Sequence, residues 1–176
     1  MTPEEIAARA EIQHVLMTYC RAVDRGDAEL LRSVYHEGAM DVHGPFSGTG
    51  DEFTDYAIDK MAPFAVMGQH HVTNVYMEIA GDEAAVESYF LAVQPYVTAE
   101  GGEEQAWVAG RYLDRFAHRD GRWAVAHRYV VMDWSRASIP GPQLHYIPET
   151  YPLGARGEAD PSAELFRSIR ERAATS

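Results

Sequence analysis

Two adjacent histidines, His70 and His71, stand in the stretch QHHVTN at residues 69–74 and could support acid–base or metal chemistry. Apolar residues alternate along this stretch, which is typical of a β-strand. Adjacent strand residues point to opposite faces, so the two imidazoles cannot easily serve one site. Alternation groups His71 with Val75 and Met77 on the more apolar face and His70 on the other face. The pattern therefore weakens a shared metal site and mildly favours His71 as the buried histidine.

A carboxylate that could pair with a histidine lies near the end of the first expected helix. Asp24 falls at the border of the apolar stripe of that helix. It could be a solvated residue of the helix end or a carboxylate at the rim of a cavity. Bonded to one imidazole nitrogen, such a carboxylate would fix the tautomer of the ring and favour proton uptake at the other nitrogen.

An arginine, Arg128, lies in the last expected strand and shares a face with small and apolar residues, including Ala124 and Ala126. An unpaired guanidinium is costly to bury, so it must reach the sheet edge, pair with an acid, or meet an anionic or electron-rich ligand. The two alanines would leave room for a ligand above that face. The sequence therefore leaves two roles open for Arg128, a structural ion pair and a contact with a ligand.

Other reactive residue types give weaker signals. Asp41 and His43 would share one face of a short strand, but no HExxH or CxxC motif accompanies them, and we expect no metal site. Cys20, the only cysteine, takes a mid-helix apolar position that favours a packed thiol over a nucleophile. No Gly-x-Ser-x-Gly motif indicates a serine hydrolase.

The elements that must position these residues begin with helices. Apolar residues at three- and four-residue steps predict a helix over residues 2–23, with Thr2 as its cap and Gly26 beyond its end. A second helix, capped by Asp27, is expected to include Val34 and Tyr35. A short strand at 40–43, a turn-rich stretch at 44–50 and a third helix from about 51 to Pro63 follow.

Beyond the third helix the apolar period changes from 3.6 to 2, which indicates strands at 70–80, 84–98, 105–118 and 122–134. Hairpin-type turns join them, so neighbouring strands should be antiparallel. Helices followed by hairpins predict an α+β fold in which helices cover one face of a curved sheet. After residue 135 the chain becomes rich in Pro and Gly, and a last helix is expected from Asp160-Pro161.

Length and charge limit the class of protein. A chain of 176 residues with 46% hydrophobic residues predicts one compact domain, residues 1–135, with a C-terminal extension, 136–176, that packs on the domain or on a neighbouring subunit. A net charge of −12 argues against a nucleic-acid partner. No apolar run approaches the roughly 20 residues that span a bilayer, and no secretory pattern opens the chain, so we expect no membrane partner and a cytoplasmic location.

Three segments, residues 10–27, 69–74 and 110–128, together resemble SnoaL-like members of the nuclear transport factor 2-like superfamily over about residues 5–135. The similarity is greatest to the branch that contains scytalone dehydratase, hexachlorocyclohexane dehydrochlorinase and bile acid 7α-dehydratase. This resemblance implies an α+β fold in which a cone-shaped, mostly antiparallel sheet encloses an internal cavity. It also implies that the protein uses no cofactor. It also implies an Asp-His dyad that removes a proton to start an elimination.

The resemblance also implies roles for single residues. The dyad falls on Asp24 and on His70, because the H-x-x-T-N pattern matches from its first histidine. This choice opposes the preference for His71, and a β-bulge or strong curvature at the start of the strand would reconcile the two. Some members have a cavity tyrosine where this chain has His43. The expected substrate-binding residues are Tyr19, His43, Asn74, Tyr96 and Arg128.

The function that the resemblance implies is a lyase of the dehydratase type acting on a hydrophobic cyclic molecule, such as a steroid, polyketide or aromatic compound. An isomerase that moves a double bond, as ketosteroid isomerases do, is an alternative. A non-catalytic ligand-binding or assembly subunit, such as an oxygenase β-subunit, is another, because this fold carries many functions. Members of the branch associate, so we expect a homo-oligomer, a trimer or a dimer.

Overall fold

The computed structural model describes residues 1–60, 68–97, 101–138 and 155–174. Helices come first and are followed by a run of long strands. The elements in chain order are α1 (Pro3–Arg25), α2 (Ala28–Ser33), β1 (Tyr35–His43), β2 (Phe46–Thr49), α3 (Gly50–Asp55), the π-helical turn η1 (Tyr56–Lys60), β3 (Gln69–Ala80), β4 (Glu83–Val97), β5 (Glu103–Arg119), β6 (Arg122–Ser138), the 3-10 turn η2 (Gly157–Ala159) and α4 (Pro161–Ala174).

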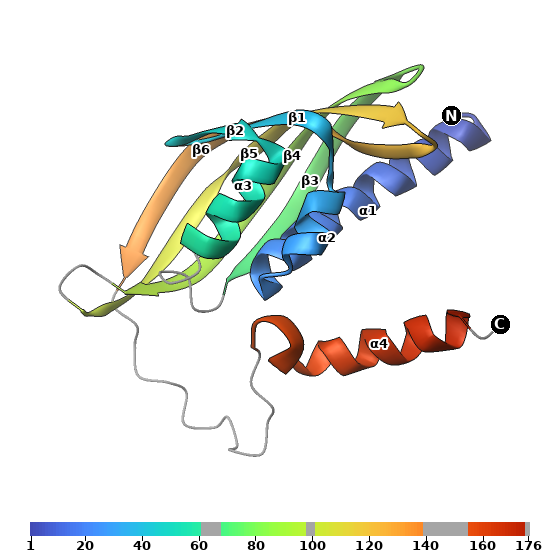
Figure 1. Cartoon of the computed structure of the whole chain (residues 1–176). Coiled ribbons are helices and arrows are strands. Elements are labelled where there is room, and N and C mark those ends of the chain that lie inside the picture. The colour runs from blue at the N-terminus through green and yellow to red at the C-terminus, as the bar shows by residue number, and fades with distance from the viewer. Residues whose placement is uncertain (61–67, 98–100, 139–154, 175–176) are drawn as a thin grey trace.

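The strands of the described residues form one six-stranded sheet in the order β2-β1-β6-β5-β4-β3. Strands β3 to β6 are antiparallel neighbours, as their short connections predict. Strand β1 returns to lie parallel to β6, and β2 pairs with β1 in the antiparallel sense. The sheet curves and does not close, and α1 and α3 lie on its concave side (Figure 1). The predicted α+β class with a curved, mostly antiparallel sheet is confirmed.

Local signals in the sequence account for both ends of α1. The Thr2 hydroxyl accepts a hydrogen bond from the Glu5 amide at 3.2 Å, and Pro3 follows at the first helical position. Gly26 ends the helix in the left-handed conformation, with φ 68°. The Asp27 carboxylate then accepts from the Leu30 amide at 2.9 Å and caps α2. The helical hairpin is therefore specified by residues next to one another in the chain.

The chain after α2 departs from the prediction. Helix α2 ends at Ser33, and Val34 and Tyr35 leave the helix, although their spacing suggested that they belong to it. The Val125 amide donates a hydrogen bond to the Val34 carbonyl at 3.0 Å, and Tyr35 pairs with Val125 in the sheet. Pairing with β6 thus overrides the local helical period. The strand expected at 40–43 is longer, and the turn-rich stretch that follows it contains β2.

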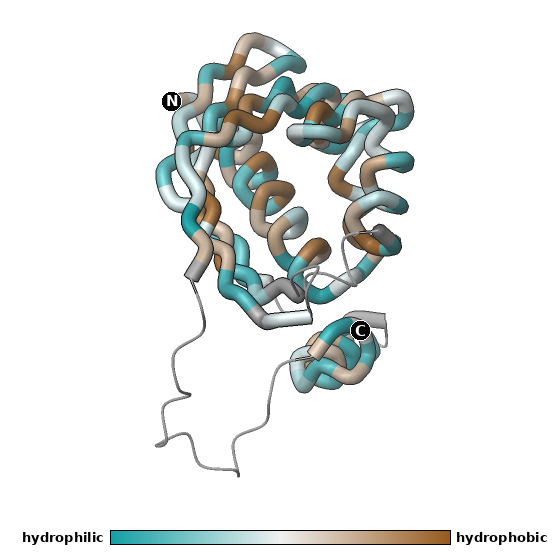
Figure 2. The backbone as a smooth tube through the Cα atoms, turned by 90° about the vertical axis from the view of Figure 1, so that its left-hand side faces the viewer, coloured by the Kyte–Doolittle hydropathy of each residue, from teal (hydrophilic) through white to brown (hydrophobic). Residues whose placement is uncertain are grey.

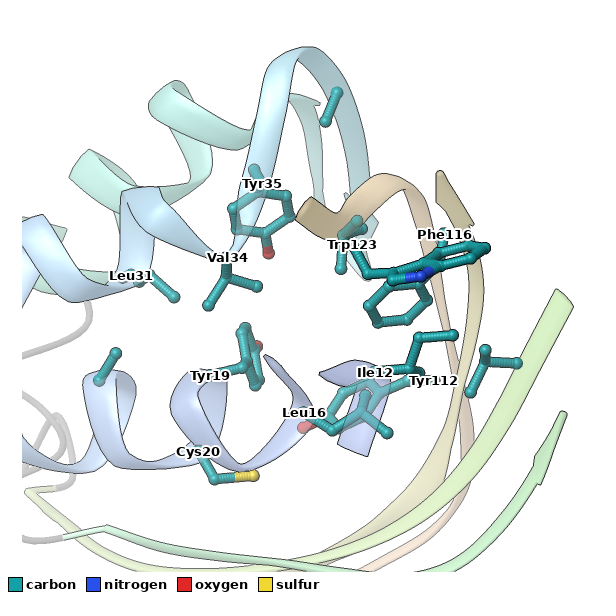
Figure 3. Close-up of a cluster of buried hydrophobic side chains, with 14 of the residues drawn as sticks. Ile12, Leu16, Tyr19, Cys20, Leu31, Val34, Tyr35, Tyr112, Phe116 and Trp123 are labelled. Carbon is teal, nitrogen blue, oxygen red and sulfur yellow. The ribbon is translucent and has the colours of Figure 1, made fainter. Parts of the chain in front are cut away.

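The hydrophobic core fills the space between α1 and the concave face of the sheet. Ile12, Leu16 and Tyr19 project from α1 toward Tyr112 and Phe116 of β5 (Figure 3). All five side chains are almost completely buried. Figure 2 shows apolar residues of α1 facing the interior of the curved sheet. This core fixes the rotation of α1 and therefore the direction of Asp24, one and a half turns beyond Tyr19.

The C-terminal helix α4 contacts the outer side of α1. The Arg21 guanidinium lies 4.4 Å from the centre of the Phe166 ring and donates to the Ser162 hydroxyl at 3.3 Å. Strand β6 continues to Ser138, past the predicted domain boundary at 135, and residues 139–154 of the predicted extension lie outside the described residues. Among the described helices, none is long and apolar enough to cross a membrane.

Candidate active site

An aspartate and a histidine that are 46 residues apart in the sequence meet between the end of α1 and the start of β3. The Asp24 Oδ1 atom lies 2.6 Å from His70 Nδ1, and Asp24 Oδ2 accepts a hydrogen bond from the His70 amide at 3.0 Å. An ionised carboxylate only accepts hydrogen bonds, so Nδ1 carries the proton and Nε2 keeps a free lone pair. Both side chains are nearly buried. The pair can therefore present Nε2 as a base in a fixed orientation.

A bulge in β3 turns His70, and not His71, toward the interior. Before the bulge Val72 pairs with Phe90 of β4, and after it Val75 pairs with Ser88, so β3 has one extra residue. The extra residue reverses the alternation, and His70 and Val75 both face the concave side. His71 is exposed. The preference for His71 from alternation was wrong, and the bulge predicted to reconcile the two readings is confirmed.

A cavity lies beside the pair. Its apolar wall includes Val23, Phe53 and Ala57. Polar side chains from five parts of the chain, namely α1, β1, β3, β4 and the C-terminal segment, complete it: Tyr19, Asp24, His43, His70, Gln94 and Arg156. Its volume of about 50 Å³ has room for water molecules, so a cyclic ligand requires movement of the lining side chains.

A second Asp-His arrangement contributes to the cavity from β1. The His43 ring stacks on Phe53, with ring centres 4.8 Å apart, and its Nδ1 lies 3.5 Å from Asp41 Oδ1. Asp41 is fully buried, and its Oδ2 accepts a hydrogen bond from the Tyr35 hydroxyl at 2.6 Å. Burial raises the pKa of Tyr35 well above its ordinary value, which keeps this donor protonated. The imidazole of His43 is thus held between an aromatic ring and a buried carboxylate.

The predicted cavity arginine, Arg128, has a structural partner. Its Nε and Nη2 donate to the two oxygens of Asp114 at 2.8 and 2.7 Å, and both side chains are fully buried. The guanidinium lies 4.1 Å from the centre of the Tyr19 ring and 4.3 Å from that of Tyr112. Arg128 therefore lies behind Tyr19, which itself lines the cavity. Of the two readings left open by the sequence, the structure shows the ion pair.

Tyr19 links this buried arginine to the cavity. Burial raises the pKa of Tyr19 above its ordinary value, although Arg128 acts in the opposite direction. The phenol is therefore neutral at physiological pH and keeps its proton for donation to a ligand. Burial acts to lower the pKa of Arg128, but Asp114 together with Tyr35 and Tyr19 raises it well above its ordinary value, so the guanidinium stays charged.

The structure does not bring every predicted residue to the cavity. Tyr19 and His43 line it with the Asp24–His70 pair. Asn74 is exposed in β3 beside the bulge and does not line the cavity. Tyr96 pairs with Glu104 in the sheet, and its side chain lies outside the described part of the chain.

Three polar residues of this region were not predicted as site residues. Gln94 could have been found, because it continues the inward alternation of Phe90 and Ala92 along β4. Asp41 was considered only as a weak metal ligand, and its burial depends on tertiary packing. No periodic pattern surrounds Arg156, so nothing in the sequence indicated that it reaches the cavity.

Metal and thiol chemistry find little support in this region. Within the described ranges, no three or more His, Cys, Asp or Glu side chains gather as a metal site would require. Cys20 is buried, and burial raises the pKa of its thiol to about 12. A thiol of this kind is a poor nucleophile at neutral pH.

Comparisons with known proteins agree with this fold. The model of the SnoaL-like domain family matches residues 4–129. A scytalone dehydratase-like protein from Novosphingobium aromaticivorans is 22% identical and superposes with a TM-score of 0.68 over 77% of this chain and 91% of that one. A hexachlorocyclohexane dehydrochlorinase from Novosphingobium barchaimii is also 22% identical, with a TM-score of 0.69 over 82% and 97% of the two chains. A search of curated proteins found no match.

Proposed function

Since this chain belongs to the SnoaL-like domain family, we propose that it is a cofactor-free lyase that catalyses an elimination of the dehydratase type. The observation that carries the proposal is the Asp24–His70 pair, whose free Nε2 adjoins a cavity with further polar side chains. The structural similarity to a dehydratase-like protein and to a dehydrochlorinase is consistent with this reaction class.

In the proposed reaction, His70 Nε2 removes a proton from a carbon next to a carbonyl or another electron-withdrawing group. The electron pair of that C–H bond forms a carbon–carbon double bond, and the bond to the neighbouring hydroxyl breaks. The hydroxyl takes up a proton and leaves as water. Asp24 holds the imidazole in position and stabilises the imidazolium while it carries the proton.

Two side chains are suited to assist the departing hydroxyl and to stabilise the negative charge that develops on the substrate. His43 can donate a proton or hydrogen bond to the departing hydroxyl, with Asp41 behind its ring. Tyr19 can donate from its neutral phenol to an oxygen on which negative charge develops. Charges and dipoles held in place before the reaction stabilise such an oxygen without reorganisation.

The apolar wall of the cavity, which includes Val23, Phe53 and Ala57, supports a hydrophobic substrate. The present volume of about 50 Å³ implies that such a substrate widens the cavity as it binds. We therefore expect binding to be accompanied by changes in the side chains around Phe53.

The proposal is tested with a panel of cyclic β-hydroxy ketones, from which a compound that the wild type converts is selected. His70→Ala should lower the turnover number by about a hundredfold or more, because general-base catalysis is lost. His71→Ala is the matched control, because it removes an imidazole from the exposed residue next to His70. The rate of this variant should equal that of the wild type. An unchanged rate for His70→Ala would refute the assignment, and a product of unchanged mass would indicate isomerisation instead.

We also propose that the protein is a homo-oligomer that buries the convex face of the sheet. Large apolar side chains are exposed on the face of the described strands opposite to Arg128 and Tyr112: Tyr76, Tyr89, Trp107, Tyr129 and Trp134. Exposed apolar patches of this kind commonly mark interaction surfaces. Analytical ultracentrifugation should show a dimer or trimer for the wild type and a smaller species for Tyr129→Glu. A monomeric wild type would contradict this proposal.

A further inference from the structure

An arginine from the C-terminal segment, Arg156, enters the cavity that contains His70. It precedes η2 and packs on the end of α1, against Gly26. A methyl group added at Gly26 would lie only 2.7 Å from Arg156 Nη2 and 2.8 Å from Nε. The guanidinium therefore approaches the backbone more closely than any residue with a side chain at position 26 would permit.

Contacts on the chain after Arg156 hold it in this place. The Asp160 carboxylate accepts hydrogen bonds from the amides of Ala155 and Ser162, each at 3.0 Å. Asp160 also lies 3.8 Å from Arg25 Nε, and Arg21 donates to the Ser162 hydroxyl. Two arginines from the last turns of α1 thus anchor the segment, and Arg156 projects from it toward the cavity.

The guanidinium of Arg156 has hydrogen-bonding capacity that the described residues do not use. It makes no hydrogen bond or ion pair with any residue in the described ranges. The acid whose charge acts on its pKa is Asp24, which already accepts two hydrogen bonds from His70. Burial lowers the pKa of Arg156, and Asp24 acts in the opposite direction, yet an arginine side chain stays charged at neutral pH. The backbone carbonyls at the end of α1 favour a cation there but do not neutralise it.

Within the described part of the chain this cation has no ion-pair partner, although the protein carries a net charge of −12. The overall charge repels an anionic ligand, so a local cation is required if one is to bind. A planar guanidinium matches the two oxygens of a carboxylate and can donate two parallel hydrogen bonds to it. Val23 and Phe53 lie in the same cavity and suit an attached ring.

We propose that Arg156 binds a carboxylate group of the substrate, so that the ligands of this cavity are carboxylate-bearing cyclic compounds. This inference rests on the proposed function for the identity of the cavity, and it names the chemical class of the substrate. Arg156 holds the carboxylate at one end of the cavity, while the reacting carbon lies beside His70. The C-terminal segment thereby takes part in substrate selection.

The test compares two small probes that differ mainly in charge, 2-naphthoate and 2-naphthamide, by isothermal titration of the full-length protein. The wild type should bind the carboxylate about tenfold or more tightly than the amide, because hydrogen bonds between two charged groups are stronger than those to a neutral group. Arg156→Gln should lose this preference by weakening naphthoate binding about tenfold, with little effect on naphthamide. Arg156→Lys should retain part of it.

Arg170→Gln, which removes the same charge from an exposed position of α4, is the matched control and should bind both probes as the wild type does. Equal affinities for the two probes in the wild type, or no binding of either, would overturn the proposal. An unaltered preference in Arg156→Gln would also overturn it. These results are independent of turnover, so they are distinguishable from a failure of His70→Ala to slow the reaction.

Discussion

Replacement of Asp114 by Asn should strongly destabilise the fold, because it leaves Arg128 buried without its counter-charge. Both oxygens of Asp114 accept hydrogen bonds from Arg128, at 2.8 and 2.7 Å, and neither side chain is exposed. Removal of one partner from a buried ion pair costs about 3–5 kcal/mol. The rings of Tyr19 and Tyr112 contact the same guanidinium and cannot replace a full negative charge.

The neighbouring pair between Arg111 and Asp133 provides a matched control. It joins the same two strands with two hydrogen bonds, each of 3.2 Å, but the Asp133 side chain is 39% exposed. Asp133→Asn should cost about 1 kcal/mol or less, as exposed ion pairs do. Urea unfolding followed by circular dichroism measures both variants at one protein concentration, since oligomerisation affects stability.

With an m-value of about 2 kcal/mol/M, a loss of about 3 kcal/mol lowers the urea midpoint by about 1.5 M. Asp133→Asn should lower it by about 0.5 M or less. Equal midpoints for the two variants would refute the argument that burial makes the Asp114–Arg128 pair essential.

The remaining predictions concern the C-terminal segment and the buried thiol. Hydrogen bonds from Ala155 and Ser162 lower the pKa of Asp160 from 3.8 to about 2, so its stabilising effect is complete above about pH 4 and is lost as the pH falls through about 2. Hydrogen exchange should show that α4 of the wild type loses protection over this pH range. The Asp160→Asn variant should show low protection of α4 at every pH. Equal protection in both proteins would contradict the role of the Asp160 carboxylate as an anchor. Cys20, whose pKa burial raises to about 12, should react with a thiol reagent at pH 8 only after unfolding in urea, and rapid reaction of the native protein would refute its burial.

Elements specified by neighbouring residues could be predicted from the sequence. Asp120 and Gly121 both take positive φ, as a two-residue hairpin turn requires, and β5 and β6 meet there as predicted. The caps of α1 and α2 are likewise local. The extension of β1 could not be predicted, because it depends on pairing with β6, which follows it by about 80 residues in the chain.

The candidate site divides in the same way. Alternation alone assigned the wrong histidine, because the bulge near Val72 changes the face of every residue before it. Resemblance to a family selected His70, and the structure places it against Asp24. Arg156 could not be predicted, since its position results from contacts of Asp160 and Ser162 with α1 and from the absence of a side chain at Gly26.

The central claim is that Asp24 holds a proton on Nδ1 of His70, so that Nε2 is the ring nitrogen that accepts a proton from the substrate. Nitrogen-15 NMR of histidine-labelled protein at pH 8 tests it directly, because the two ring nitrogens give different shifts when one carries the proton. We predict the Nδ1–H tautomer for His70 in the wild type and its loss in Asp24→Asn, with no change for the exposed His71. An Nε2–H tautomer for His70 in the wild type, or a spectrum unaffected by Asp24→Asn, would contradict the assignment of His70 as the base.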